Sequence, residues 1–247
     1  MHKKFSPQKM FLFSLTLFFV VYISHATAFS FAPMSSTIGN SGAEAVITYT
    51  VSNDTDKKIA VTIKAMHRLI DANGAETTTP ANESFLIFPS RVVLNPMTSQ
   101  LVKVQYRGPS AILREAAYRI VAEQLPVDFT KSDGSAVNIL LTYVAALYVS
   151  PSNALADVVV MDAVGSEYQN KRGIVITLKN KGTKHAMIAE PIVQIRQGPI
   201  FVEFAEEATS AINGQNILAG GERVFFLPWD SAIVGTVYKG TFSAEIE

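Results

Sequence analysis

Alternating apolar and polar residues dominate the chain from Phe29 onward. Four segments alternate with period two and are rich in β-branched and aromatic side chains, which is typical of half-buried β-strands: residues 43–53, 58–68, 100–108 and 117–125. Turn-forming stretches separate them, such as DANG at residues 71–74 and SDG at residues 132–134. No segment shows a sustained helical period. Short strands separated by turns predict an antiparallel β-sandwich.

The same pattern resumes after SPSN at residues 150–153, which has the composition of a linker. Further strand-like segments follow, and the single Trp, Trp229, lies in one that is interpreted as a core strand running into a turn. The chain is therefore interpreted as all-β, with an N-terminal sandwich domain at residues 29–150 and a C-terminal one at residues 151–247. The two halves show no residue-level repeat.

Residues 135–151 break the alternation. From Val137 to Val149 only Asn138 and Thr142 interrupt the apolar side chains. A central strand that is buried on both faces would have this pattern. So would a strand that serves its own core on one side and a hydrophobic partner on the other. Periodicity alone does not distinguish these two interpretations.

The first 28 residues predict a secretory signal peptide. A basic segment with three lysines is followed by an apolar run at residues 11–23 and by ATA at residues 26–28, the small-residue pattern of a cleavage site. The apolar run is shorter than the ~20 residues that a membrane-spanning helix needs. We therefore expect export, cleavage after Ala28 and no membrane insertion.

Removal of this leader changes the charge balance. Three of the 21 Lys and Arg residues and none of the 21 Asp and Glu residues lie in it, so 18 basic and 21 acidic residues remain. A slightly acidic chain has no basic surface for nucleic acid. The chain also has no cysteine, which excludes disulfides, thiolate metal sites and thiol nucleophiles.

Candidate catalytic residues are few. His67 and His185 are the only histidines after the leader, and neither has a second histidine or a carboxylate at metal-ligand spacing, so both are interpreted as surface or edge-strand residues. The adjacent Glu206 and Glu207 are interpreted as strand neighbours that point to opposite faces and are solvated. No nucleophile motif or phosphate-binding glycine loop is present. We therefore expect no enzyme activity, no metal and no cofactor.

Four motifs, in this order, resemble the periplasmic pilus-assembly chaperones, the PapD-like family: YTVSND at residues 49–54, FPSRVVLNP at 88–96, AYRIVAEQLP at 117–126 and LYVSP at 147–151. The resemblance implies two immunoglobulin-like domains in an L-shaped arrangement. It also implies a non-enzymatic periplasmic chaperone that binds, folds and caps pilus subunits and delivers them to an outer-membrane usher.

The resemblance also implies a role for the apolar stretch. In the family, the last long strand of the first domain is lent to a subunit that lacks a strand, which is a case of β-strand addition. Alignment on Pro151 assigns the subunit-binding side chains to Val137, Ile139, Leu141 and Tyr143. Residues of the opposite phase are then expected to face the domain's own core: Leu140, Val144, Ala146 and Tyr148.

The chain departs from the typical family pattern at three positions. Typical members anchor the subunit's C-terminal carboxylate with an Arg and a Lys, but the matching positions hold Thr37 and Ala146, and a hinge Arg is replaced by Ser150. These departures resemble the archaic chaperone–usher branch, whose subunits are spore-coat-U-like pilins. The candidate replacement anchors are the bases Arg91, Arg119 and Lys103.

Three alternatives remain at this stage. A pilus subunit or adhesin would normally have a free donor segment at its N-terminus, whereas residues 29–40 turn directly into the next strand. An exported carbohydrate-binding sandwich would need clustered exposed aromatic residues. A hydrolase with dispersed catalytic residues is the third. For a chaperone, an exposed apolar strand edge also suggests self-association of the free protein.

Overall fold

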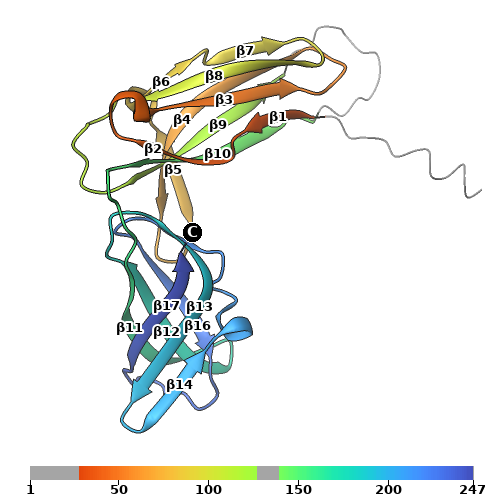
Figure 1. The fold of residues 1–247 in the computed structure, drawn as a ribbon. Helices are drawn as coiled ribbons and strands as arrows, with labels where there is room; N and C mark the ends of the chain where they lie inside the picture. Colours follow the sequence, from red (N-terminus) through yellow and green to blue (C-terminus); the bar gives the residue numbers. More distant parts are fainter. Residues whose placement is uncertain (1–27, 127–138, 247) are drawn as a thin grey trace, which may run out of the picture.

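A computed structural model describes residues 28–126 and 139–246, so the expected leader lies outside the described residues. The chain forms two β-sandwiches set at an angle to each other (Figure 1). Helical structure in the described residues is limited to three 3-10 turns: η1 (Gly42–Ala45), η2 (Asn82–Ser84) and η3 (Glu206–Thr209). The all-β prediction is confirmed. No described helix is long and apolar enough to cross a membrane.

The first sandwich consists of two sheets. One has the strand order β1 (Phe29–Ala32), β3 (Val46–Asn53), β8 (Thr98–Tyr106), β6 (Phe85–Phe88). The other has the order β2 (Ser35–Gly39), β10 (Thr142–Ser150), β9 (Ala116–Leu125), β4 (Ile59–Ile70), β5 (Glu76–Pro80), and β7 (Arg91–Leu94) also pairs with β4. All pairs are antiparallel except β10 with β2, which is parallel.

The alternation in the sequence becomes the core of this sandwich. Alternate residues of a strand point to the same face, so β9 buries Tyr118, Ile120 and Ala122 and leaves their neighbours partly exposed. Tyr49 and Val102 from the first sheet meet this face, and both are fully buried in the same cluster. Burying such side chains contributes about 1.5–3 kcal/mol each.

The second sandwich has its own core. Its sheets are β11 (Val158–Tyr168), β12 (Lys171–Asn180), β16 (Glu222–Pro228), and β14 (Ile200–Phe204), β13 (Ala186–Gln197), β15 (Asn216–Ile217), with β17 (Lys239–Ile246) also paired to β13. Ile174, Ile176 and Leu227 are fully buried between them. Trp229 directly follows β16 and packs against this core, as the sequence predicts.

The two sandwiches share no core residue. β10 ends at Ser150 and β11 begins at Val158, while the domain boundary near Ser150 stays a prediction. The turn between β4 and β5 reaches the second sandwich (Figure 1), where the Val224 amide donates to the Ala72 carbonyl at 2.8 Å. A second backbone bond joins the Glu115 amide to the Thr183 carbonyl at 2.9 Å. Both bonds run from one domain to the other.

The two sandwiches share a repeated feature that the sequence analysis missed. Asn53 ends β3 and Asn180 ends β12, and both are fully buried. Each side-chain amide donates to a carbonyl four residues ahead, at Lys57 (2.8 Å) and Lys184 (2.7 Å). Each also donates to a more distant strand or loop. The two domains therefore close equivalent strands with the same buried side chain.

Candidate functional site

The upstream part of β10 has one unpaired edge. β10 pairs with β9 from Thr142 to Val149, but with β2 only from Ala146 to Ser150. The Ala146 amide points to the β2 side, where it donates to the Met34 carbonyl at 2.8 Å. Because successive amides alternate sides, those of Thr142 and Val144 point to the same side. No described strand pairs with them there.

The phase of β10 differs from the expected one. Ala145, Leu147 and Val149 are fully buried in the first core, and Leu141 and Tyr143 pack against it. The expectation that Leu140, Val144, Ala146 and Tyr148 face this core is wrong. Leu140 and Val144 are 47% and 43% exposed, and Ala146 and Tyr148 line a cleft next to the second domain. Over Ala146–Val149 both faces of the strand are apolar because the first core buries one and the other lies next to the second domain, so hydrophobicity does not reveal the phase.

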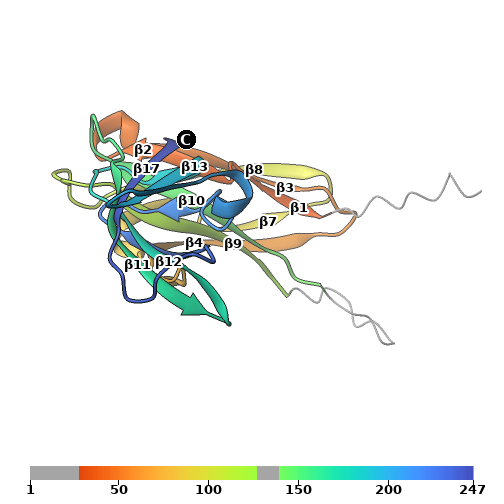
Figure 2. The same cartoon turned by 90° about the horizontal axis from the view of Figure 1, so that it is seen from below.

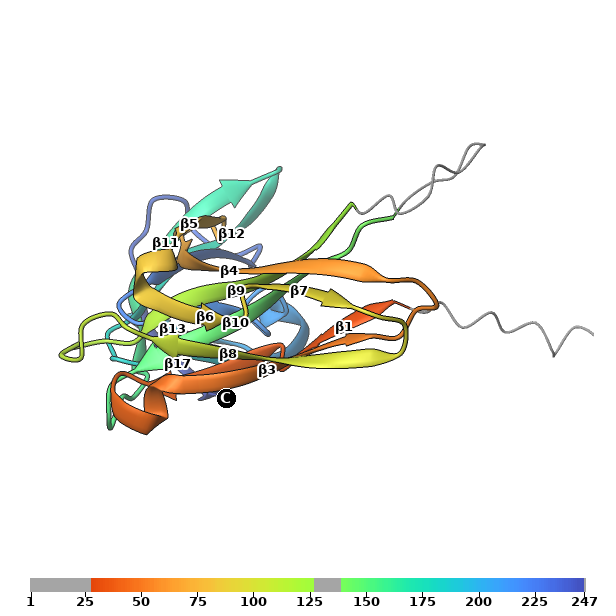
Figure 3. The same cartoon turned by 90° about the horizontal axis from the view of Figure 1, so that it is seen from above.

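The expected subunit-binding residues lie in different surroundings. Ile139 is 75% exposed, whereas Leu141 and Tyr143 are half-buried, and Val137 lies outside the described residues. The Tyr143 hydroxyl donates to the Phe29 carbonyl at 2.6 Å, and its ring meets the Phe29 ring edge-on. The described ends of β9 and β10 diverge from the rest of the sandwich (Figures 2 and 3). The side of β10 that is buried in the first core at Ala145 is half-buried at Tyr143 and Leu141, and it is exposed to solvent at Ile139.

A cleft of about 350 Å³ lies between the domains. Its walls come from the first sandwich, through Ser35, Arg68, Ile70, Gly74, Glu76, Arg119, Ala146 and Tyr148, and from the second, through Met187, Gly214, Gln215, Asn216 and Arg223. Of the three candidate anchors only Arg119 is among them. Arg91 is exposed on β7, and Lys103 is exposed on β8 in the opposite sheet. The structure therefore does not bring these three bases together.

Glu76 is the one acid among these cleft residues, and two arginines hold it. Arg119 donates from Nε to Oε1 at 2.8 Å and from Nη2 to Oε2 at 2.5 Å. Arg68 donates from Nε to Oε2 at 2.8 Å. The hydrogen bond from Arg119 is the main reason why the pKa of Glu76 lies below its usual value. The carboxylate is thus strongly held in its charged form.

The Tyr148 hydroxyl joins the arginine pair to the second domain. Arg68 Nη1 donates to it at 2.9 Å and Asn216 Nδ2 at 2.7 Å. A hydroxyl has two acceptor positions and one proton to donate. With both acceptor positions filled, the Tyr148 proton remains available to an acceptor in the cleft.

Arg223 is the second domain's cation in the cleft. Its Nη2 donates to Gln215 Oε1 at 2.9 Å, while its buried Nε has no partner in the described part of the chain. No carboxylate of the described residues lies within salt-bridge distance of it. Burial lowers the pKa of this guanidinium from its usual value. Among the residues that line the cleft, three arginines face one carboxylate, and Asp71 outside the lining also acts on Arg223.

The position of His185 differs from the surface or edge-strand position that the sequence predicts. It is buried at the domain junction rather than on a surface, with its ring stacked on Tyr148 at 3.7 Å between centroids. Its backbone amide donates to Glu115 Oε1 at 3.0 Å, and its Nδ1 lies 2.5 Å from the same oxygen. His67 is half-buried and packs against Tyr118. The pair Glu115 and His185 therefore belongs to the joint between the domains.

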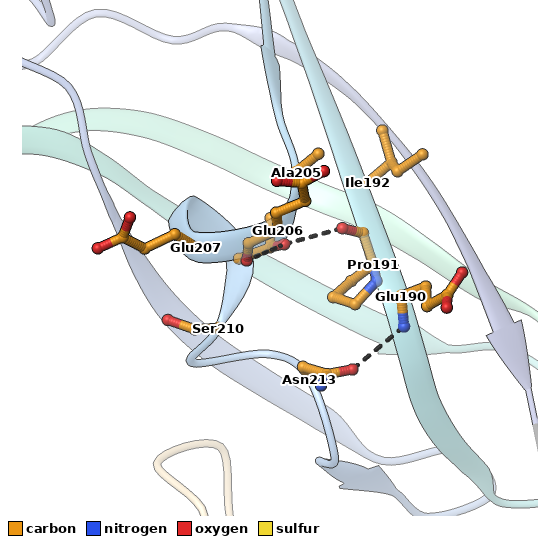
Figure 4. A pocket seen from close by; sticks show the side chains of 9 residues that line it. Glu190, Pro191, Ile192, Ala205, Glu206, Glu207, Ser210 and Asn213 are labelled. Carbon is orange, nitrogen blue, oxygen red and sulfur yellow. Dashed lines mark hydrogen bonds between the residues drawn. The ribbon is translucent and has the colours of Figure 1, made fainter.

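A second pocket lies in the C-terminal sandwich (Figure 4). Glu206 and Glu207 are exposed, as expected, but they lie in η3 and not on a strand. The carboxylates of Glu190 and Glu207 lie on opposite sides of the pocket (Figure 4). The described residues contain no group of side chains that could hold a metal ion. Nothing in this pocket converges on a ligand.

The comparisons with known proteins identify the family. The model of the pili and flagellar-assembly chaperone family, PapD N-terminal domain, matches residues 31–154, just over half of the chain. The chain belongs to this family. It is a pilus-assembly chaperone by family, and the prediction made from the four motifs is confirmed. No curated protein is similar enough in sequence to count as a relative.

Solved structures of similar chaperones share the fold at low sequence identity. The class 5 fimbriae chaperone CfaA is 14% identical over 89% of this chain and 99% of its own, with a TM-score of 0.56. The chaperone–tip adhesion subunit complex CsuC–CsuE, from archaic chaperone–usher pili of Acinetobacter baumannii, gives 14% identity over 84% and 93%, with a TM-score of 0.54. The Salmonella enterica SafA pilin–SafB chaperone complex gives 12% identity over 90% and 98%, with a TM-score of 0.52.

Sequence reasoning missed most polar residues of the cleft in this chaperone, among them Arg68, Glu76, Asn216 and Arg223. Arg119 is a candidate because it is a base inside an apolar strand pattern, and Arg68 has the same feature in AMHRLI at residues 65–70. Glu76 carries no such signal, because only the β4–β5 pairing places it beside Arg68 and Arg119. Asn216 and Arg223 enter the cleft through the docking of the second domain.

Proposed function

We propose that this chaperone captures pilus subunits with β10 and the segment before it, and holds them until an outer-membrane usher takes them over. The observation that carries the proposal is the unpaired edge of β10 upstream of Ala146, next to apolar side chains that already face a core. An exposed edge of this kind pairs readily with another strand.

We call β10 and the segment before it the chaperone's donor segment. Its side chains would extend the chaperone's core into the subunit. Leu141 and Tyr143 pack at the margin of the first core, and the exposed Ile139 lies farther out. We propose Val137, Ile139, Leu141 and Tyr143 as the residues that meet a subunit whose own core is open along a missing strand. Each that becomes fully buried contributes roughly 1.5–3 kcal/mol, before the cost of ordering the segment.

The cleft would hold the subunit's C-terminal carboxylate. Thr37 and Ala146 cannot provide the charge that typical members use there, so the function falls to other bases. Arg119 is the favoured candidate, with Arg68 beside it, because both line the cleft and a guanidinium can grip two carboxylate oxygens. Arg91 and Lys103 are less suitable because they lie outside it.

We also infer the setting of this activity. The leader pattern supports export to the periplasm with cleavage after Ala28. The uncharged positions Thr37 and Ala146 support the archaic branch and spore-coat-U-like pilins as partners. The protein acts by binding, without catalysis or a cofactor, and self-association of the free chaperone would cover the exposed strand edge.

Single substitutions on either side of the donor segment test this function. Ile139→Asp is expected to abolish capture of a co-expressed spore-coat-U-like pilin while the thermal melt of the chaperone stays unchanged, because the charge would be buried only in the complex. Leu140→Asp is the matched control, since this neighbour is also exposed. Loss of capture in Leu140→Asp but not in Ile139→Asp would assign subunit binding to the other face.

A further inference from the structure

We propose that Glu76 is a resident carboxylate that occupies the arginine site of the free chaperone, and that a captured subunit replaces it with its own terminal carboxylate. The identity of the incoming chain rests on the proposed function. The replaceability of Glu76 rests on the geometry of the cleft alone.

The first support is the way in which Glu76 is held. Arg119 grips both of its oxygens and Arg68 adds a third hydrogen bond, which is the arrangement that an incoming carboxylate would need. While Glu76 is in place, the Nε of both arginines is occupied by it. A second carboxylate cannot gain the same contacts unless Glu76 gives them up.

The second support is the difference in how firmly the partners are fixed. The side chains of Arg68 and Arg119 are 8% and 18% exposed and extend from the paired strands β4 and β9. Glu76 is the first residue of β5, an edge strand whose five residues are all exposed. Its side chain can therefore swing out without disturbing a core, whereas the arginines cannot follow it.

The third support is the set of donors that Glu76 leaves unused. The Tyr148 hydroxyl accepts two hydrogen bonds and keeps its own proton, and Arg223 donates from its Nη groups to neutral oxygens only and makes no bond to Glu76. Both line the same cleft. A carboxylate arriving from outside can take these donors in addition to those that it takes from Glu76, which favours the exchange.

This arrangement would make the cleft selective. Glu76 is tethered beside the arginines, so its effective concentration there is about millimolar or higher, and a dilute free carboxylate cannot compete with it. The terminal carboxylate of a subunit already bound to the donor strand is tethered equally well. Glu76 thus restricts the site to ligands that engage both the strand and the cleft.

Acetate provides a test that needs no pilin. Removing the resident carboxylate in Glu76→Ala should let acetate bind the vacated arginines and raise the melting temperature, relative to equal chloride, by roughly 2–4 °C at saturation. Wild type should show no such shift. Glu123→Ala is the matched control, because Glu123 pairs with Lys64 on the same sheet but outside the cleft. An equal response to acetate in all three proteins would overturn the proposal.

A spore-coat-U-like pilin with a free or an amidated C-terminus provides the second test. Glu76→Gln should bind the free form about five- to twentyfold more tightly than wild type does, and the amidated form equally well. Weaker binding of the free form by Glu76→Gln would show that Glu76 positions the arginines rather than occupying them, which overturns the proposal. If wild type captured neither form, the proposed function would fail, while the acetate result would still decide whether the arginine site accepts a carboxylate other than Glu76.

Discussion

Charged residues inside apolar strands need a partner, because an unpaired charge that loses water is costly. Arg68 and Arg119 satisfy this requirement with a single carboxylate, whose own pKa they lower. Arg223 is buried with hydrogen bonds to neutral groups only. At the scale of the residue, the cleft is therefore a cationic site in which one carboxylate is already bound.

The pH dependence of the free energy of unfolding should report the ion pairs of Glu76 with Arg68 and Arg119. The folded-state pKa of Glu76 lies below its ordinary value of 4.5, so the unfolded chain takes up the proton first as the pH falls. The contribution of Glu76 to the free energy of unfolding is complete well above pH 4.5, and it is lost as the pH falls through the folded-state pKa. Urea unfolding of wild type and Glu76→Gln should thus differ at pH 7 and converge in acid. A difference that grows in acid would contradict this assignment.

At the scale of the element, strands were easier to predict than their faces. The segments at residues 43–53 and 117–125 match β3 and β9 closely, because one of their faces is buried and the other is not. The apolar stretch also forms a strand, but both of its faces are buried over Ala146–Val149, so its phase had to come from the structure. Arg119 could be singled out as a base inside an apolar strand pattern, while Glu76 could not be found without the strand pairing.

The buried asparagines are an element-scale feature with a direct test. Asn53→Ala or Asn180→Ala leaves buried carbonyls without a donor and should lower the free energy of unfolding by about 1–3 kcal/mol in each case. Urea unfolding measures the loss. Asn82→Ala, in the exposed η2 turn, is the control and should be nearly neutral. A neutral result at Asn53 would show that the turn holds its shape without this side chain.

At the scale of the whole molecule, the domains are joined by polar groups that are far apart in the sequence. Glu115 and His185 are separated by 70 residues, and Tyr148, in the proposed donor strand β10, stacks on the histidine. No local sequence pattern predicts such a pair, which is why His185 was expected on the surface. The joint therefore connects β10, the proposed subunit-binding strand, to the docking of the second domain.

Breaking this joint should loosen the arrangement of the domains. Glu115→Ala removes the acceptor of the His185 amide in a buried place, with an expected loss of about 1–3 kcal/mol. Small-angle scattering should show a broader range of interdomain angles than in wild type, while each sandwich keeps its strands by circular dichroism. An unchanged scattering curve would mean that the remaining interdomain bonds set the angle without the Glu115 side chain.

Amide hydrogen exchange along β10 tests the central claim most directly. The amides of Thr142 and Val144 point to the unpaired edge, whereas those of Tyr143 and Ala145 point toward β9. In the free chaperone the first pair should exchange rapidly and the second slowly. When a pilin subunit binds, Thr142 and Val144 should become protected because they pair with its strand. Persistently rapid exchange at both residues in a stable complex would contradict the assignment of β10 as the donor strand.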